Sequence, residues 1–585
     1  MLVRLLLCVI FFVVHGFILI SSGLANAVEV RRPNIVVIMP DDQGYGDHGV
    51  TGNSILRTPN IDTLAQESAS MSDFYVCPVC SPTRASLMTG RYHYRTRVVD
   101  TFKGRSMMEP EEVTIAEILQ GAGYATGIFG KWHLGDSYPL RPNDQGFDES
   151  YIHRGGGLAQ PSEPIENNRR YTDPILFENG KQIDTEGYCT DLYFDAAIRF
   201  IDRCKKEGKP FFVYLPTNAP HGPFHDVPQE LYEYYKTVDL KSIMVGKRGN
   251  VDQLARIAAM IENVDQNIGK LDRHLKEQGL FDNTMVVYLV DNGPNSMRFA
   301  GPFRGMKTMV HEGGIRSPLF VRWPDRIRPG TVSDRIAAHI DLLPTIADAA
   351  GVNVPDEANV DGRSLLPLLE GQTPEWPDRH IVLQVHRGDE PVRYHHMAVR
   401  NQRWKLVHPS GFGQEVMPEG VPFELYDMNS DQGETANLAE TKPEKLKAML
   451  KAYDAWFDDV STTRTDNYAP PRMVIGSDKE AVTALTLQDW RVSNSVGWGE
   501  SGVWLVSVER PATFDAELVY SQPVGPMDLT LSIGRVTRKA TLEEGKKRLV
   551  ISGISVPQGD AEVQVRSSIK GRKGDPYHVI LSRVD

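Results

Sequence analysis

Short apolar runs alternate with amphipathic stretches over the first two thirds of the chain. The runs contain few polar residues, which is typical of strands buried on both faces of a parallel sheet. The stretches between them repeat apolar residues at steps of three and four and predict helices that pack on the sheet. Alternating strands and helices predict an α/β fold. The expected strands are 34–39, 69–75, 126–129, 211–215 and 284–290, and the expected helices are 61–68, 113–123, 191–205 and 254–275.

The pattern changes twice towards the C-terminus. Residues 403–407 and 424–427, followed by an amphipathic stretch over 443–457, predict a smaller antiparallel sheet closed by a helix. We interpret Tyr468-Ala469-Pro470-Pro471 as a linker. Beyond it, polar and apolar residues alternate between Gly, Pro and Asp boundaries, which predicts a β-sandwich from about residue 473 to the end.

Three tryptophans of this last region, Trp490, Trp498 and Trp504, allow two interpretations. They form a face on which sugars stack, or they belong to the core of the sandwich. The core is the commoner position for aromatic residues in such a fold.

The N-terminus has the features of an export signal. Arg4 precedes an apolar run from Leu5 to Ile20, and Ala25-Asn26-Ala27 has the small residues of a signal peptidase site. This pattern predicts that residues 1–27 are a signal peptide and that the mature protein is periplasmic or secreted. An uncleaved membrane anchor is the alternative, but the run is short for a membrane span, so no membrane association is expected after cleavage.

The composition limits the classes of function. A chain of 585 residues is too long for one ordinary core, so two or three domains are expected. Its net charge of −12, without a basic run, argues against a nucleic-acid partner and means that an anionic substrate needs a local basic pocket. Four cysteines remain after signal cleavage, and a helix is expected between Cys189 and Cys204. We therefore expect mostly free cysteines.

Two pairs of oxygen ligands follow expected strands. Asp41 and Asp42 come after strand 34–39, and Asp291 and Asn292 come after strand 284–290. Adjacent carboxylates are costly unless a cation or separate partners neutralise them, although an ordinary acidic turn is the alternative. Oxygen-only ligands suit Ca²⁺ or Mg²⁺ rather than structural zinc.

Basic residues follow two further strands. Lys131 and His133 come after strand 126–129 and are expected on the same side of an extended segment. His221 comes after strand 211–215, between two prolines. Each of them alone is more often an ordinary surface or loop residue. Their shared position at the carboxyl ends of strands is where open α/β sheets form their sites.

Cys80 precedes an expected helix that has Pro82 in its first turn, where the missing N–H costs nothing. The free N–H groups and partial positive charge at that helix end favour an anion beside Cys80. The alternative is that Cys80 is a small buried residue without a chemical role.

Together these motifs resemble those of the sulfatase family. The order Cys80-Ser81-Pro82-Thr83-Arg84, followed by Leu87-Met88-Thr89-Gly90-Arg91, is similar to the sulfatase signature. Gly130-Lys131-Trp132-His133-Leu134-Gly135 is similar to a second one. Further similar segments are Asp41-Asp42, 303–308, 311–316 and 361–365, so that the resemblance extends from about residue 33 to 460.

The resemblance implies a fold and a division into domains. Residues 28–375 are expected to form a catalytic domain with a large mixed, mostly parallel sheet flanked by helices, as in the alkaline phosphatase superfamily. Residues 376–460 then form a smaller α+β subdomain. Residues 473–585 lie beyond the resemblance and are the all-β accessory sandwich predicted from the alternating pattern.

The resemblance also implies the nucleophile. In sulfatases a separate maturation enzyme oxidises the cysteine of this motif to formylglycine, an aldehyde that hydrates to a diol. One hydroxyl attacks sulfur, and the other expels sulfate when its proton is removed. By resemblance this cysteine is Cys80, because Cys77 has neither Pro two residues later nor Arg four residues later.

The other candidate site residues divide by resemblance into metal ligands and cationic groups. A divalent cation, with Ca²⁺ as first choice and Mg²⁺ as second, is bound by the diol from Cys80 and by Asp41, Asp42, Asp291 and Asn292. Arg84 and Lys131 hold the diol, and His133 takes the proton that triggers sulfate release. Sulfate is bound by Lys131, His221 and Lys307, and either of the last two protonates the leaving alcohol.

The sequence therefore predicts an exported sulfatase that hydrolyses a sulfate monoester of an aryl alcohol or of a sugar. Its expected partners are a sulfated small molecule or glycan and the maturation enzyme. Two alternatives stay open. The first is a phosphonate monoester or phosphodiester hydrolase of the same superfamily, and the second is a carbohydrate-binding protein with an inactive sulfatase-like core.

Overall fold

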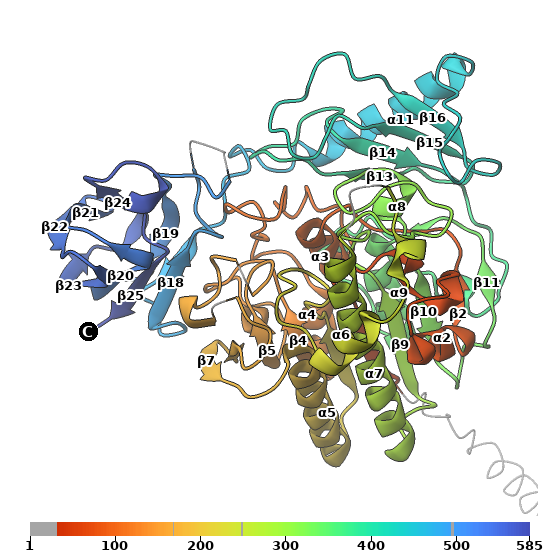
Figure 1. Ribbon diagram of the computed structural model, residues 1–585, viewed down its shortest axis with the longest axis horizontal. Coiled ribbons are helices and arrows are strands. Elements are labelled where there is room, and N and C mark those ends of the chain that lie inside the picture. Colours follow the sequence, from red (N-terminus) through yellow and green to blue (C-terminus); the bar gives the residue numbers. More distant parts are fainter. Residues whose placement is uncertain (1–31, 159, 168, 247–249, 493–496) are drawn as a thin grey trace, which may run out of the picture.

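The computed structural model describes residues 32–158, 160–167, 169–246, 250–492 and 497–585. The predicted signal peptide, residues 1–27, lies outside these ranges. Figure 1 shows a large α/β body, an α+β subdomain with the cyan helix α11 at the top, and a separate blue lobe of β-strands at the left. In this described part, no helix is long and apolar enough to cross a membrane.

A ten-stranded mixed sheet forms the centre of the α/β body. Its order is β11-β2-β10-β9-β1-β8-β4-β5-β6-β7, and the neighbours from β9 to β5 are all parallel. The two edges turn antiparallel at β10 and β6. The strands are β1 (Asn34–Ile38), β2 (Ala69–Met71), β4 (Ala125–Lys131), β5 (Glu149–His153), β6 (Ile175–Glu178), β7 (Lys181–Asp184), β8 (Phe211–Leu215), β9 (Thr284–Leu289), β10 (Leu319–Arg322) and β11 (Val332–Ser333).

Helices cover both faces of this sheet, as the uninterrupted apolar strands require. Val36 and Ile38 of β1 pack into the core on one face, whereas Ile35 and Val37 pack into the core on the other, because successive side chains of a strand point in opposite directions. The first face is covered by α2 (Pro59–Gln66), α5 (Cys189–Glu207), α6 (Gln229–Tyr235) and α7 (Val251–Glu277). The second is covered by α3 (Cys80–Thr89), α4 (Ile115–Gly121), α9 (Leu342–Ala350) and α10 (Leu366–Leu369).

One expected strand is divided in the structure. Residues 69–75 form β2, which joins the large sheet, and β3 (Phe74–Tyr75), which pairs with β12 (Ala337–Ala338) in a separate two-stranded sheet. The chain bends between them at Ser72 and Asp73. The strand preceding the Cys80 segment is therefore β3 and lies outside the main sheet.

The α+β subdomain is an antiparallel sheet closed by a helix, as predicted. Two of its strands, β13 and β14, were not predicted from the sequence. The elements are β13 (Ile381–Gln384), β14 (Met397–Arg400), β15 (Trp404–His408), β16 (Glu424–Asp427) and α11 (Pro443–Val460).

A buried ion-pair network joins this subdomain to the α/β body. Lys405 on β15 has a fully buried side chain, and its Nζ lies 2.9 Å from Oε1 of Glu312 and 2.7 Å from Oε1 of Glu434. Glu312 begins the short helix α8 (Glu312–Ile315) and is also paired with Arg316. Lys405 thus bridges two buried carboxylates from different parts of the chain, and Arg316 is a second cation for one of them.

The Lys405→Met variant is expected to be strongly destabilised, by about 3–5 kcal/mol, because it leaves two buried carboxylates without their shared cation. Thermal unfolding would measure this as a clear fall of the midpoint. Lys447→Met, at an exposed lysine of α11, is the matched control. An equal midpoint in the two variants would contradict the stabilising role of Lys405.

The C-terminal β-domain is a sandwich of two sheets around one apolar core. One sheet consists of β17 (Met473–Ile475), β19 (Trp504–Val508), β24 (Gly559–Ser567), β21 (Met527–Ile533) and β22 (Val536–Leu542). The other consists of β18 (Val482–Thr486), β25 (His578–Arg583), β20 (Ala512–Val524) and β23 (Lys546–Val556). The architecture of residues 473–585 is therefore the all-β sandwich expected from the alternating pattern.

In this C-terminal region the structure decides between the two interpretations of the tryptophans and corrects the interpretation of residues 468–471 as a linker. Trp490 and Trp504 are core residues, each 1% exposed, so they do not form a sugar-stacking face. Trp498 packs only partly against the core and remains available to a ligand. The segment interpreted as a linker is not an exposed tether, since Tyr468 is buried and its hydroxyl donates to the carbonyl of Val460.

Candidate active site

The carboxyl ends of the parallel strands bring the predicted site residues together. Asp41 and Asp42 follow β1, Lys131 ends β4, His221 follows β8, and Asp291 follows β9. Since β4, β8, β1 and β9 are neighbours and parallel, these residues lie at the same edge of the sheet. Hydrogen bonds, ion pairs and close approaches connect all ten predicted residues into one cluster.

Cys80 is the first residue of α3 rather than the residue before the helix. All ten residues of α3 are buried, and Cys80 itself is 3% exposed. Thr83, one turn further on, donates from its hydroxyl to the carbonyl of Asp291 and accepts from the amide of Cys77. These bonds fix the start of α3 against the end of β9, so the Cys80 side chain is held beside the carboxylates.

Three residues present a possible set of metal ligands. The Sγ of Cys80 and one carboxylate oxygen each of Asp41 and Asp291 lie within 4.8 Å of one another, and all three residues are buried. The Oδ1 atoms of Asp41 and Asn292 are buried without a hydrogen-bond partner. Orphaned oxygens beside paired carboxylates fit a hard divalent cation, and the Cys80 thiol lies where the resemblance predicts the diol oxygens.

Two buried cations interact with these carboxylates. Lys131 Nζ donates to Oδ2 of Asp41 at 2.5 Å, and Arg84 donates to Oδ2 of Asp291 at 2.9 Å and to the carbonyl of Lys131 at 3.0 Å. Burial favours the neutral acid, but Lys131 and the other nearby cations offset it and hold the pKa of Asp41 well below its usual range. At Asp291, burial and then repulsion by Asp41 raise the pKa to about 7. A cation between the two carboxylates would relieve this repulsion.

His133 contacts the Cys80 side chain directly. The two residues meet through Nδ1 and Sγ at 3.4 Å, and Nε2 of the imidazole lies 2.8 Å from the carbonyl of Thr101. Because a carbonyl can only accept, Nε2 holds the proton and Nδ1 presents its lone pair to Cys80. Burial, followed by repulsion from Lys131 and Arg84, holds the pKa of His133 well below its usual range, so the imidazole is a neutral base.

One local prediction from the sequence was wrong here. An extended segment was expected to place Lys131 and His133 on the same side, but β4 ends at Lys131 and His133 has a left-handed backbone, with φ of 63°. Both side chains still reach the Cys80 cluster, because the sharp turn after β4 directs the imidazole towards α3.

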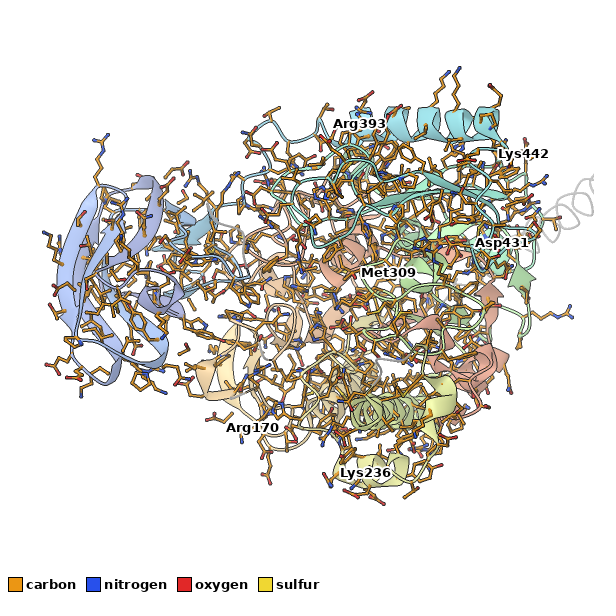
Figure 2. The ribbon with its side chains drawn as sticks, turned by 45° about the horizontal axis from the view of Figure 1, so that its top comes forward. Arg170, Lys236, Met309, Arg393, Asp431 and Lys442 are labelled. Atoms are coloured by element: carbon orange, nitrogen blue, oxygen red, sulfur yellow. The ribbon has the colours of Figure 1, made fainter. Side chains whose placement is uncertain are left out.

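The remaining basic residues lie on the less enclosed side of the cluster. The side chain of Lys307 is 16% exposed and that of His221 is 18% exposed. Lys307 forms an ion pair with Oδ1 of Asp42, and Nε2 of His221 lies 3.7 Å from Oδ2 of the same residue. Met309, labelled in Figure 2, follows on the loop of Lys307 and is exposed. An anion entering from this side meets two basic side chains before it reaches Cys80.

A pocket of about 790 Å³ lies between the three parts of the molecule. None of the ten predicted site residues lines it, but two of its lining residues adjoin the cluster. Thr101, whose carbonyl accepts from His133, is in its wall. Gln160 is in another wall, and the nearby Gly157 packs so closely on His221 that an added Cβ would lie 3.0 Å from Nδ1. The other lining residues are Phe102, Arg387, Gly413, Gln414, Glu415, Val416, Gly497 and Trp498.

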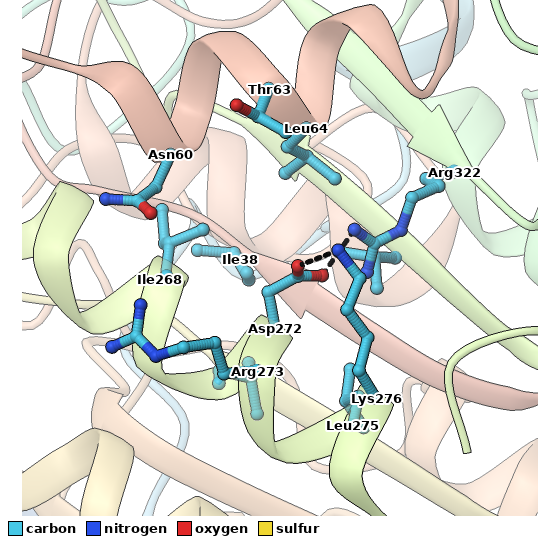
Figure 3. Close-up of a pocket in the computed structure, with 13 residues that line it drawn as sticks. Ile38, Asn60, Thr63, Leu64, Ile268, Asp272, Arg273, Leu275, Lys276 and Arg322 are labelled. Atoms are coloured by element: carbon cyan, nitrogen blue, oxygen red, sulfur yellow. Dashed lines mark ion pairs between the residues drawn. The ribbon is translucent and has the colours of Figure 1, made fainter. Parts of the chain in front are cut away.

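A second pocket, of about 200 Å³, lies between α2 and α7 (Figure 3). None of the ten predicted site residues lines it. Asp272 there forms ion pairs with Arg322 and with Lys276, as the dashed lines show. The ion pair with Arg322 of β10 holds α7 against the sheet, whereas the one with Lys276 lies within α7, so both have a structural role.

Sequence reasoning missed three polar residues around the cluster. Thr83 connects α3 to β9, Thr101 accepts from His133, and Gln488 of the β-domain donates to the same Thr101 carbonyl. No spacing or motif indicates these contacts, because they join segments that are distant in the sequence or involve a main-chain atom.

Comparison with known proteins identifies the family. The chain matches the family model of Sulfatase over residues 33–352 and that of N-sulphoglucosamine sulphohydrolase, C-terminal, over residues 304–454. The chain belongs to the sulfatase family. Human arylsulfatase A is 31% identical over 511 residues, covering 78% of this chain and 93% of its own. Dog N-acetylgalactosamine-6-sulfatase is 32% identical over 402 residues, covering 64% and 72%.

Solved structures agree with this assignment. The crystal structure of Ps i-CgsB has a TM-score of 0.64 and 28% identity, covering 74% of this sulfatase and 94% of the other chain. The same protein in complex with k-i-k-neocarrahexaose has a TM-score of 0.63. Phosphonate monoester hydrolase SpPMH from Silicibacter pomeroyi, at 21% identity and a TM-score of 0.54, shares the fold. The predicted family, fold class and hydrolysis of sulfate esters are thus confirmed.

Proposed function

We propose that this sulfatase is exported, uses formylglycine formed from Cys80, and removes sulfate from a sulfated saccharide. The observation that supports this best is the position of Cys80. It starts a buried helix, beside two carboxylates and a neutral histidine whose lone pair faces its side chain.

The residues around Cys80 have the properties that the reaction needs. A hydrated formylglycine supplies one hydroxyl that attacks sulfur and a second that expels sulfate as the aldehyde re-forms. His133 Nδ1 is placed to accept the proton of the second hydroxyl. A divalent cation on Asp41, Asp42, Asp291 and Asn292 would polarise the sulfate oxygens.

The cationic side chains account for binding of the sulfate group and for departure of the alcohol. Arg84 and Lys131 are both fully buried and pair with Asp291 and Asp41. These ion pairs fix the two cations in position to hold the diol. Lys307 and His221, on the more open side, bind the sulfate oxygens and provide the proton for the leaving alcohol. Negative charge that develops in the transition state is therefore surrounded by four basic groups.

The pocket beside the cluster supports a saccharide as the alcohol part of the substrate. It combines the aromatic rings of Phe102 and Trp498, whose centroids are 5.1 Å apart, with the amides of Gln160 and Gln414. Aromatic faces stack on sugar rings, and amides bind hydroxyl groups. The names of N-acetylgalactosamine-6-sulfatase and of the neocarrahexaose complex agree with this substrate class.

Comparison of turnover on p-nitrophenyl sulfate and on bis-p-nitrophenyl phosphate tests the reaction class. A large preference for the sulfate is expected. A preference for the diester would instead favour the phosphodiester hydrolase alternative. N-acetylgalactosamine 6-sulfate and k-i-k-neocarrahexaose are the first saccharides to assay.

Trp498→Ala is expected to raise KM for a sulfated oligosaccharide about 3- to 10-fold, because it removes one stacking ring of the pocket. The KM for p-nitrophenyl sulfate, which is too small to extend across the pocket, should stay the same and acts as the internal control. Equal KM changes for both substrates would contradict a saccharide-binding role of Trp498.

Export is proposed from the N-terminal sequence. The intact mass of the mature protein from its native host tests it, with Val28 expected as the first residue. A mass that includes residues 1–27 would favour the membrane-anchor alternative.

A further inference from the structure

Gln488 belongs to the C-terminal β-domain, but its side chain reaches the wall of the active site. It follows β18 and is 1% exposed. Its Nε2 atom donates to the carbonyl of Thr101 at 2.8 Å and to the hydroxyl of Ser106 at 3.0 Å. The same Nε2 atom lies 3.3 Å from Nε2 of His133.

These contacts form a short path from the β-domain to the nucleophile. The Thr101 carbonyl accepts both from Nε2 of His133 and from Nε2 of Gln488. Since that carbonyl determines which nitrogen of His133 holds the proton, it also determines that Nδ1 faces Cys80 as a base. The partner that a histidine has on its second nitrogen controls both tautomer and ring orientation.

The loop that contains Thr101 is held from two sides. Arg387 of the α+β subdomain donates to the Thr101 hydroxyl and pairs with Asp100, and the β-domain contacts the rest of the loop. Residues 100–106 join no strand of either neighbouring sheet. The amide of Gly104 donates to the carbonyl of Gln488 at 2.7 Å, and an added Cβ at Gly104 would lie 2.4 Å from Pro470. Main-chain and side-chain atoms of Gln488 thus hold this loop at two points.

We propose that Gln488 is a positioning residue, through which the β-domain holds the Thr101 carbonyl and thereby orients His133 towards the nucleophile. This inference rests on the proposed role of His133 as the base. Both matched family models end at or before residue 454, so Gln488 lies outside the part of the chain that they describe. The accessory domain is then part of the catalytic machinery as well as a wall of the substrate pocket.

Other contacts keep the β-domain docked when Gln488 is changed. Glu480 accepts from the amide of Tyr138, and Nε2 of His578 lies 2.7 Å from the carbonyl of Pro161. Arg548 pairs with Glu166 at 2.6 Å across the same interface, with both side chains about half exposed. A substitution at Gln488 therefore tests the path to His133 without separating the domains.

The experiment compares Gln488→Met, which keeps the volume but removes the donor, with wild-type enzyme on p-nitrophenyl sulfate. We expect kcat to fall about tenfold or more, as for other residues that orient a catalytic histidine, with KM changed less than about twofold. Formylglycine content, measured by peptide mass, should equal that of the wild type. Arg548→Ala, which breaks an exposed contact of the same interface, should keep the wild-type kcat.

A second arm separates positioning from a general structural effect. In the His133→Ala background, Gln488→Met should cause no further loss of kcat, because the residue through which it acts is gone. If Gln488→Met does not fold, Gln488→Asn provides the same test, since its amide is one methylene too short to reach Thr101.

Each result bears on the proposal. An unchanged kcat in the Gln488 variant of an active enzyme overturns it, as does an equal loss in the His133→Ala background. A wild-type enzyme with formylglycine that fails on sulfate esters and saccharide sulfates overturns the proposed function itself. A loss of kcat in Gln488→Met that occurs only when His133 is present supports both the inference and the proposed function.

Discussion

Cys80→Ala is expected to lower kcat/KM for p-nitrophenyl sulfate by about 10⁵-fold or more, because it removes the nucleophile around which the site is built. The buried thiol itself is a poor nucleophile, since burial, the largest effect, raises its pKa despite the nearby Lys131. The proposed mechanism therefore predicts that activity requires oxidation of this residue to formylglycine. In the peptide containing Cys80, mass spectrometry should find a loss of about 18 Da relative to the thiol, together with labelling by an aldehyde reagent.

Cys77→Ala is the matched control, three residues earlier on the same segment. Cys77 is as deeply buried as Cys80, but its Sγ lies 3.3 Å from Nε2 of His339, away from the carboxylates. Its replacement should leave kcat/KM within a few-fold of the wild type. Full activity in Cys80→Ala, or an unmodified thiol in an enzyme that turns over sulfate esters, would show that formylglycine is not the nucleophile.

Much of the fold could be predicted because strands that are buried on both faces appear in the sequence as uninterrupted apolar runs. Residues 34–39, 211–215 and 284–290 are β1, β8 and β9 to within one residue at either end, and residues 254–275 lie inside α7. Failures occurred where tertiary pairing decides the element. The segment 69–75 has one continuous β-like pattern, yet its two halves pair in different sheets. Local sequence contains no information about which partner strand lies nearby.

The site could be predicted to the extent that its residues stand next to one another in motifs or at strand ends. Asp41 and Asp291 are 250 residues apart in the chain, but both follow parallel strands, and this topology explains their proximity. The contact between Thr101 and Gln488 could not be predicted from motifs or from strand ends. Their contact depends on how the β-domain docks on the α/β body, which is determined by many weak contacts at once.

The docking of the domains also explains why one accessory domain can affect both binding and chemistry. Trp498 lines the pocket proposed for a saccharide, while Gln488, ten residues earlier, contacts the loop behind His133. Substitutions at the two positions should therefore have different effects. A change at Trp498 should alter KM for large substrates, and a change at Gln488 should alter kcat for all substrates.

Asp41→Asn is expected to lower kcat about 10³-fold, because the variant loses a negative charge from the predicted metal site without a change of volume. Loss of a metal that stabilises charge on sulfate removes several kcal/mol of transition-state stabilisation, and 1.36 kcal/mol corresponds to tenfold in rate. Chelation of the wild-type enzyme should have a similar effect, and added Ca²⁺ should restore the activity. Asp265→Asn, at a buried carboxylate that binds Asn60 and Ile61 on the α2 side, is the control and should retain the response to Ca²⁺.

A readout independent of activity distinguishes loss of the ion from loss of the chemistry. A ligand that binds only the folded state stabilises it, by about 2.7 kcal/mol at 100 times its Kd, so Ca²⁺ should raise the midpoint of thermal unfolding of chelated wild-type enzyme. Asp41→Asn should lack this shift, because Asp41 then no longer offers a carboxylate to the cluster with Asp291 and Cys80. A shift with Mg²⁺ but not with Ca²⁺ would change the identity of the ion and keep the site. No shift with either ion would contradict a divalent metal at this position, and Asp41 would then act only as the partner of Lys131.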